Sequence, residues 1–196
     1  YRKAIPVDVR DSCIVRVGDS RDQPFESACF DGVISSPPYL TRLDYVVGHL
    51  PELATLGLHE ADIAALRESM IGTPKITQVS AQEALGPKVA DLLEIVDAHD
   101  SYAARSYYAK NFRQYFEGMA DSLNEIGRVV VPGAPVALVV QDSHFKDIHI
   151  DLADLISDQA ESMGWTSLAR KDFRNVRSMA QVNTRAHEKA RTTKPT

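Results

Sequence analysis

The stretch that decides the fold is VISSPPY, residues 33–39. A run of strand-forming residues enters two consecutive prolines, and an aromatic residue follows at once. Proline fixes φ near about −65° and has no N–H, so this backbone can only accept hydrogen bonds. Ser36 adds a hydroxyl that can accept as well. The stretch therefore predicts a β-strand that ends in a rigid turn, rich in acceptors, beside the ring of Tyr39.

Such a turn suits a planar ring that carries an exocyclic amine. The two N–H groups of the amine would be held by Ser36 and the Pro37 carbonyl, while the ring stacks on Tyr39. These acceptors would draw the nitrogen toward a tetrahedral form and free its lone pair for attack on an electrophile. A base in a double helix would first have to flip out of the stack. The alternative is a turn that only ends a strand and buries Tyr39.

The chain alternates between short apolar runs and helical patterns. Successive apolar positions predict strands that are covered on both faces. These strands are expected at residues 13–17, 30–35, 129–131 with 136–140 after a Pro-Gly turn, and 165–169. The alternation predicts an α/β layered fold with a mostly parallel sheet.

Helices are predicted in three regions. Residues 48–98 indicate a helical insertion in about three pieces, broken at Thr73-Pro74 and Gly86-Pro87. The clearest helix has apolar residues on one face and is ended by Gly127; its spacing is set by Tyr108, Phe112, Tyr115, Met119, Leu123 and Ile126. This aromatic-rich face indicates a core-facing helix, with a base-stacking platform as the alternative. A further helix is expected at 148–163, capped by Gly164.

Three polar segments follow predicted strands directly: 18–20, 35–39 and 141–143. In open α/β sheets, ligands bind at the carboxyl ends of the strands. We therefore expect these three exits to converge on one cleft.

The stretch GDSRDQPFESACFDGVISSPPY, residues 18–39, resembles the DNA amino-methyltransferases that act on N4 of cytosine or N6 of adenine. The resemblance implies a Rossmann-like class I methyltransferase fold, S-adenosylmethionine as cofactor and DNA as substrate, as in restriction-modification systems. It implies that Ser36, Pro37, Pro38 and Tyr39 hold the target amine and base. It also implies a cofactor site at Asp19, which would meet the adenine, with Ser20 and Ser35 beside it. Ser in first place of the motif is commonest among N4-cytosine enzymes.

One part of the family pattern is missing. The stretch GRVVVPGAPVALVVQDS, residues 127–143, also resembles the family, with Ala134 where a second Gly is frequent. The family's Gly-rich cofactor loop, usually D-P-F-x-G-x-G, does not occur in residues 1–196. We therefore expect residues 1–196 to be a single, partial catalytic domain, with the loop on a missing segment or a second chain.

The charge distribution allows a nucleic-acid contact although the whole chain has a net charge of −5. Residues 168–196 contain eight Lys and Arg against two acidic residues, a net charge of +6, which leaves −11 for the rest. A local basic stripe can bind phosphates on an acidic protein because salt screens distant charges. The predicted contacts are Arg42 and Tyr45 after the motif, and Arg174 and Arg177 in a basic C-terminal segment at 174–196. A solvated tail is the alternative.

Other chemistries have little support in the sequence. Cys13 and Cys29 form no disulfide framework or zinc pattern, and His144 and His149 lack a third metal ligand. No segment is long and apolar enough to span a membrane, so we expect a cytoplasmic protein. Two other functions remain open: an RNA amino-methyltransferase, such as one acting on a guanine of tRNA, and a non-catalytic nucleic-acid-binding subunit.

Overall fold

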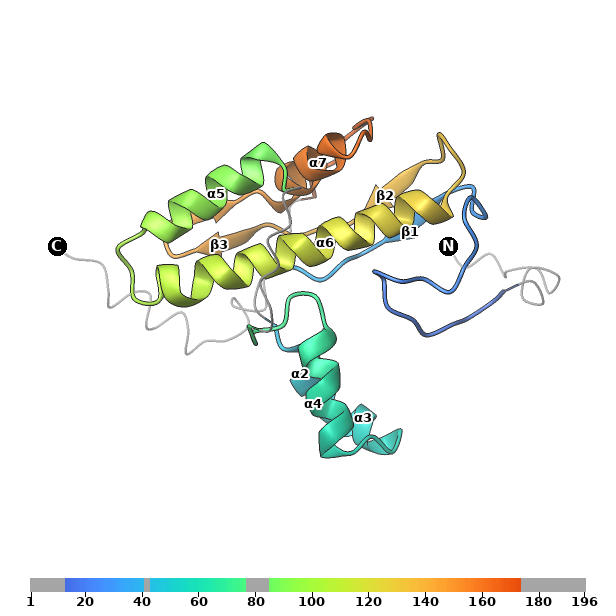
Figure 1. Ribbon diagram of the computed structural model, residues 1–196, viewed down its shortest axis with the longest axis horizontal. Helices are drawn as coiled ribbons and strands as arrows, with labels where there is room; N and C mark the ends of the chain where they lie inside the picture. Colours follow the sequence, from blue (N-terminus) through green and yellow to red (C-terminus); the bar gives the residue numbers. More distant parts are fainter. Residues whose placement is uncertain (1–12, 41–42, 77–84, 174–196) are drawn as a thin grey trace. The chain divides into compact units, whose positions relative to one another are not determined.

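The computed structural model describes residues 13–40, 43–76 and 85–173 (Figure 1). The chain divides into a main unit, which runs to Thr166, and a second unit from Ser167 onward. Residues 167–173 of the second unit contain no helix or strand. The elements of the main unit, in chain order, are β1 (Val33–Ser35), α2 (Tyr45–Gly48), α3 (Leu50–Thr55), α4 (Glu60–Ser69), α5 (Pro87–Ala98), the π-helical turn η1 (Ala104–Tyr108), α6 (Ala109–Val129), β2 (Val136–Leu138), β3 (Ser143–Phe145), β4 (Ile148–Ile150) and α7 (Leu152–Ser162).

The described strands form two small sheets. β1 and β2 are parallel, with Val33 opposite Val136 and Ser35 opposite Leu138. β3 and β4 form an antiparallel hairpin. The predicted α/β class is confirmed, whereas the described strands contain one parallel and one antiparallel pair and not a mostly parallel sheet.

The core lies between α6 and the helices α5 and α7, with the hairpin and β2 also contributing side chains. In Figure 1, α6 is the long yellow helix that runs in front of β1 and β2. Its buried face carries the periodic apolar residues that the sequence places there: Phe112, Tyr115, Phe116, Met119 and Leu123. The core-facing interpretation of this helix is therefore confirmed.

Two predicted strands are shorter than expected. Of 30–35 only Val33–Ser35 form β1, and of 129–131 with 136–140 only Val136–Leu138 form β2. The reason is that Val129 still belongs to α6 and Val130 makes only an isolated bridge to Phe30.

Two further predicted strands are wrong. Residues 13–17 form no strand, and Ile14, Val15 and Val17 are 73%, 87% and 100% exposed. A buried parallel strand needs a hydrogen-bonding neighbour, and the described residues supply none for this segment. Residues 165–169 are also outside any strand. The Trp165 N–H bonds to the Ala160 carbonyl at 3.1 Å and closes the end of α7, so that Gly164, at φ +87°, caps this helix as predicted.

Two helix boundaries also differ from the prediction. Gly127 does not end α6, which continues to Val129; the indole ring of Trp165 lies 3.6 Å from the place that a Cβ of Gly127 would take. The helix expected at 148–163 begins only at Leu152, because residues 148–150 pair as β4 and the Asp151 side chain caps α7.

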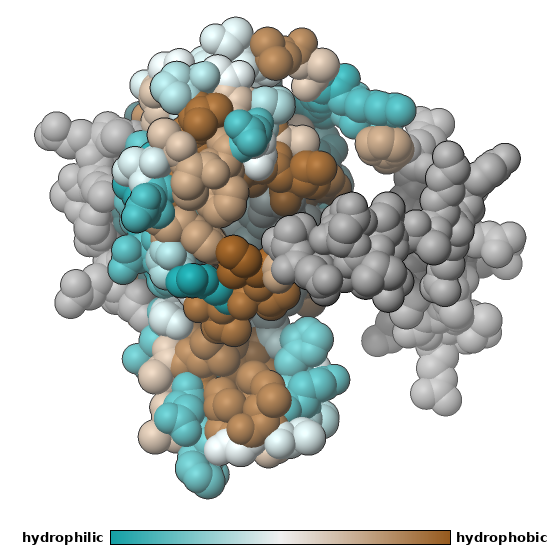
Figure 2. Space-filling view, turned by 90° about the vertical axis from the view of Figure 1, so that its right-hand side faces the viewer, coloured by the Kyte–Doolittle hydropathy of each residue, from teal (hydrophilic) through white to brown (hydrophobic). Residues whose placement is uncertain are grey.

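The sequence predicts a helical insertion at 48–98, and the described residues of this region are largely helical. The helical region consists of α2 to α5 and begins three residues earlier, at Tyr45. Pro87 occupies the first turn of α5, which explains the predicted break there. Figure 2 shows hydrophobic surface over the lower part of the molecule, where α2 to α4 lie. The exposed apolar residues of this part are Leu43, Val47, Leu50 and Leu56.

Candidate functional site

The predicted SPPY motif follows β1 directly and forms its own hydrogen bonds. The Ser36 hydroxyl donates to the Val139 carbonyl at 3.1 Å and lies 3.2 Å from the hydroxyl of Tyr39. Val139 follows β2, so Ser36 links the ends of the two parallel strands. Ser36 is exposed and Tyr39 is half-buried, which leaves a hydroxyl pair open to a ligand.

A buried tyrosine of α6 fixes the second proline. The Tyr115 hydroxyl donates to the Pro38 carbonyl at 2.7 Å. Tyr115 is 1% exposed, and burial, with the nearby Tyr45, raises the pKa of this hydroxyl well above its usual range. Tyr115 therefore remains a neutral donor. The Pro38 carbonyl is thus occupied by Tyr115. No described residue donates to the carbonyl of Pro37, next to Ser36, so that carbonyl can accept from a ligand.

The residues after Pro38 are held in the same way. The Tyr39 N–H donates to the Tyr45 hydroxyl at 3.4 Å. The buried Ser143 hydroxyl, at the start of β3, donates to the Leu40 carbonyl. The chain after β1 and the chain after β2 therefore meet, as predicted for two of the three strand exits. The hydrogen bond from Ser36 to Val139 and the hydrogen bond from Ser143 to Leu40 join them.

The third predicted strand exit, residues 18–20, makes hydrogen bonds to other parts of the chain. The Asp19 carboxylate accepts two hydrogen bonds from the Arg21 guanidinium, at 2.9 and 2.6 Å. These bonds, against some desolvation, lower the pKa of Asp19. Arg21 also donates to the Ser69 carbonyl at 2.6 Å, at the end of α4. The Ser20 hydroxyl lies 2.8 Å from that of Ser122 in α6. Within the described ranges, no hydrogen bond joins residues 18–20 to the SPPY motif.

Ser35, the third predicted cofactor residue, has a backbone role in the described sheet. It is the last residue of β1, opposite Leu138, and its carbonyl accepts from the Val139 N–H at 2.9 Å. Ser35 is therefore held by strand pairing directly before the SPPY motif.

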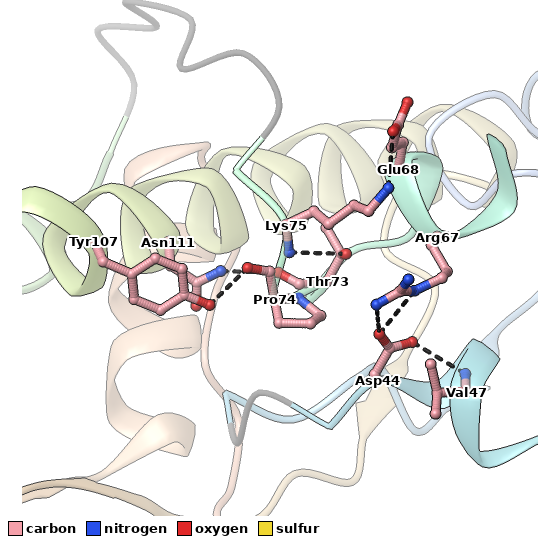
Figure 3. Close-up of polar contacts among 9 residues, drawn as sticks. All are labelled: Asp44, Val47, Arg67, Glu68, Thr73, Pro74, Lys75, Tyr107 and Asn111. Carbon is pink, nitrogen blue, oxygen red and sulfur yellow. Dashed lines mark hydrogen bonds and ion pairs between the residues drawn. The ribbon is translucent and has the colours of Figure 1, made fainter. Parts of the chain in front are cut away.

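Polar contacts join α2 to α4 and join residues 73 and 74 to η1 and α6 (Figure 3). The Asp44 carboxylate caps α2 through the Val47 N–H and accepts two bonds from Arg67, at 2.9 and 2.6 Å. Asn111 and Tyr107 donate to the carbonyls of Thr73 and Pro74 at 2.8 and 2.6 Å. The Asp44 carboxylate, two residues after Arg42 in the sequence, is therefore paired with Arg67.

Some predicted contacts lie outside the described residues, namely Arg42, Arg174 and Arg177. His144 and His149 lie opposite each other in the β3–β4 hairpin with an edge-to-face ring contact, and His149 lies 3.0 Å from an Asp142 oxygen. No group of three or more metal-ligating side chains occurs among the described residues. Nor does the described part contain a helix long and apolar enough to cross a membrane.

Sequence reasoning misses Tyr115, which holds the motif from behind, because the apolar spacing assigns it only to the core face of its helix. The hydroxyl of a tyrosine at a core position is the signal for Tyr115, because a buried hydroxyl usually finds a partner. Ser143 belongs to the polar strand exit 141–143 that the sequence places at the cleft, and the structure adds its hydrogen bond to the Leu40 carbonyl.

Comparison with known proteins identifies relatives of this chain. The type II methyltransferase M.AvaI of Nostoc sp. (strain PCC 7120 / SAG 25.82 / UTEX 2576) is 30% identical over 155 residues, which cover 72% of this chain and 32% of that protein. The same figures hold for M.AvaI of Anabaena variabilis. The type II methyltransferase M.BsoBI of Geobacillus stearothermophilus is 26% identical over 159 residues, 69% of this chain and 31% of that protein. No family model matches the chain, and no solved structure matches it significantly.

The fold and site define an α/β domain with an acceptor-rich turn at the carboxyl ends of two parallel strands. Its relatives identify it further. The predicted family relationship is confirmed: the chain is a homologue of the type II methyltransferases and spans about a third of their length.

Proposed function

We propose that this chain carries the methyl-acceptor half of an S-adenosylmethionine-dependent DNA amino-methyltransferase with a Rossmann-like fold. The target is the exocyclic amine of a flipped base, N4 of cytosine in preference to N6 of adenine. The observation that carries the proposal is the pair of available acceptors at the β1 exit, the Ser36 hydroxyl and the Pro37 carbonyl.

The acceptors act on the amine through its two N–H groups. One N–H bonds to the Ser36 oxygen and the other to the Pro37 carbonyl, and both bonds strengthen as positive charge develops on nitrogen. The Tyr39 ring supports the base, while its hydroxyl lies next to Ser36. S-adenosylmethionine supplies an electrophilic methyl group on sulfur. As the C–N bond formed, the S–CH3 bond would break and its electron pair would stay on sulfur, which leaves as a neutral thioether; the nitrogen would then release one proton to solvent or a neighbouring acceptor.

The residues present fit only part of the cofactor. The Asp19 carboxylate and the Ser20 hydroxyl are suitable partners for an adenine amine or a ribose, but Arg21 occupies the carboxylate. Residues 1–196 contain no Gly-rich cofactor loop. Further polypeptide, on the same or another chain, is therefore required for a complete cofactor site.

The β1–β2 pair has surface available for that polypeptide. Leu138 and Val140 point into the core, while the intervening positions face outward. Ile34 is 87% exposed and Val139 is 56% exposed, and the apolar residues of 13–17 are exposed too. Parallel strands are nearly always covered on both faces. This open apolar face supports a further layer that covers it in the whole protein.

Substitutions in the motif test the proposal. In a preparation that contains the Gly-rich cofactor loop, Ser36→Ala and Tyr39→Ala should each lower methyl transfer from labelled S-adenosylmethionine to DNA by about 10²-fold or more, the effect of losing one transition-state contact. Tyr102→Ala is the matched control, because Tyr102 is 94% exposed and remote from the motif in sequence. Near-normal rates in both motif variants would overturn the assignment.

The same preparation separates the alternatives. Transfer to tRNA but not to DNA would identify an RNA amino-methyltransferase. An absence of cofactor binding by isothermal titration, with the loop present, would identify a non-catalytic subunit.

A further inference from the structure

A hollow lies directly beyond the SPPY motif. It has a volume of about 420 Å³ and begins at Leu40, the residue after Tyr39. Its other lining residues come from the N-terminal part of the α6 region and from the β3–β4 hairpin: Tyr108, Phe112, Asp142, Ser143, His144, Phe145 and Lys146. This size is within the range of about 300–1,000 Å³ that small-molecule sites occupy.

The hollow has an apolar floor and a polar rim. Leu40, Phe112 and Phe145 are nearly fully buried, at 3%, 3% and 2% exposure. The exposed side chains of His144 and Lys146 form part of the rim. A ligand with a flat or sugar-like body and an anionic group matches this combination.

Lys146 is the available cation of the rim. Its ammonium lies 5.8 Å from the centre of the Tyr108 ring. The neighbouring carboxylates have histidine partners, Asp142 with His149 at 3.0 Å and Asp147 with His99 at 3.2 Å. Within the described part of the chain, no hydrogen bond or ion pair joins Lys146 to a carboxylate. The backbone of Lys146, at φ +55°, forms the hairpin turn and projects this residue at the edge of the hollow.

We propose that the hollow binds the nucleotide next to the methyl-accepting base, with Lys146 contacting its phosphate. The inference rests on the proposed function, since Ser36 and Leu40 are only four residues apart and a DNA strand held at one continues past the other. Lys146 is a positioning residue here: it fixes the strand and takes no part in methyl transfer. Tyr108 and the aromatic floor contact the sugar or base of the same nucleotide.

Salt dependence of DNA binding tests this placement. The 196-residue chain is titrated with a fluorescent random-sequence 30-base-pair duplex at several NaCl concentrations. Each phosphate contact contributes about 0.9 to the slope of log Kd against log salt. Lys146→Asn should lower the slope by about that amount. Asparagine tolerates positive φ, so this variant keeps the turn. Lys146→Arg should restore the slope. Lys88→Gln is the control, because Lys88 pairs with Asp154 on the α5–α7 side, and it should leave the slope unchanged.

The outcomes separate this inference from the proposed function. A duplex that binds with the same slope to Lys146→Asn and to the unaltered chain overturns the phosphate contact alone. An equal loss of slope in Lys88→Gln also overturns it, since the effect would then be general. Failure of the unaltered chain to bind the duplex at any salt concentration overturns the phosphate contact, and the proposed function is judged separately by methyl transfer in the loop-containing preparation. The same titration is repeated with a single-stranded RNA. If Lys146→Asn changes the slope with this RNA but not with the duplex, Lys146 contacts RNA, and the DNA assignment is contradicted.

Discussion

The hydroxyl of Tyr115, in the middle of α6, donates a hydrogen bond of 2.7 Å to the carbonyl of Pro38. Tyr115 packs edge-to-face on Phe116, with ring centroids 5.1 Å apart, and both rings are buried. The core helix thus fixes the orientation of the second proline, and through it the direction of the neighbouring Pro37 carbonyl. Rigid support of this kind is what a positioned acceptor requires.

Tyr115→Phe removes this bond and keeps the ring. The Pro38 carbonyl loses its donor, which should lower the free energy of unfolding by about 1–3 kcal/mol. Methyl transfer should fall as well, because the turn is no longer held. Tyr107→Phe is the matched control: it removes a 2.6 Å bond to the Pro74 carbonyl, which is not a residue of the SPPY motif. Chemical denaturation and a labelled-methyl assay on the loop-containing protein measure both quantities. Equal loss of methyl transfer in the two variants would contradict a special role for Tyr115.

Asp44 both caps α2 and forms an ion pair with Arg67, and two different substitutions can distinguish these roles. One carboxylate oxygen caps α2 through the Val47 N–H, and the other binds Arg67. Burial opposes ionisation of Asp44, but the bonds from Arg67 and Val47 together lower its pKa. Asp44→Asn keeps an N-cap acceptor and loses the ion pair, so it should cost no more than about 1 kcal/mol. Asp44→Ala loses the cap too and should cost about 0.5–2 kcal/mol more. Urea denaturation that gives equal losses for both variants would show that the cap does not contribute.

The sequence predicts most of what local periodicity and turn chemistry determine. The apolar spacing from Phe112 to Leu123 identifies the core face of α6, and the prolines identify the end of β1. Prediction from the sequence fails where the secondary structure of a segment depends on residues that are distant in the chain. Residues 13–17 have the composition of a buried strand but no described strand pairs with them. Ile148 to Ile150 alternate over only three residues, too few to distinguish β4 from the first turn of a helix.

The residues of the candidate site also differ in whether local sequence identifies them. Ser36 to Tyr39 are identifiable because the prolines constrain the backbone wherever they occur. Tyr115 and Ser143 are 79 and 107 residues from Ser36 in the chain, and they reach the motif only through the packing of α6 and the position of β3 after β2. The sequence expects the exit that contains Ser143 to lie at the cleft, but the hydrogen bonds that Tyr115 and Ser143 make become visible only in three dimensions.

Glu125 and Arg128 predict a change in stability at acidic pH. Arg128 donates to both carboxylate oxygens, at 2.8 and 2.5 Å, and the Gln23 N–H donates at 2.8 Å. These bonds, those from Arg128 first, lower the pKa of Glu125 from 4.5 to about 2. A carboxyl with a lowered folded-state pKa stabilises fully above its unfolded pKa, and this stabilisation is lost as the pH falls from 4.5 toward 2.

The test compares thermal unfolding across that pH window. Glu125→Gln should lower the Tm at neutral pH and flatten its decline on acidification. Glu94→Gln, at an exposed position of α5, serves as the control and should follow the unaltered protein. Parallel Tm curves for Glu125→Gln and the unaltered protein would mean that the pair does not contribute.

Gly86 is required by the contact between α5 and α7. A Cβ at this position would overlap the Asp158 carboxylate and lie 3.1 Å from the backbone of Gln159. The same carboxylate accepts from the Lys88 N–H at 3.0 Å, so Gly86→Ala would break that bond and separate the helices. We expect a loss of about 1–3 kcal/mol, as for other overpacked sites. Gly48→Ala is the control, because nothing lies within 4 Å of its Cβ position and alanine favours helix. It should leave stability unchanged or raise it by up to about 1 kcal/mol. Since Gly86 has φ −57°, backbone strain cannot account for a loss there. Equal stability of the two variants in urea denaturation would show that α7 moves aside without cost.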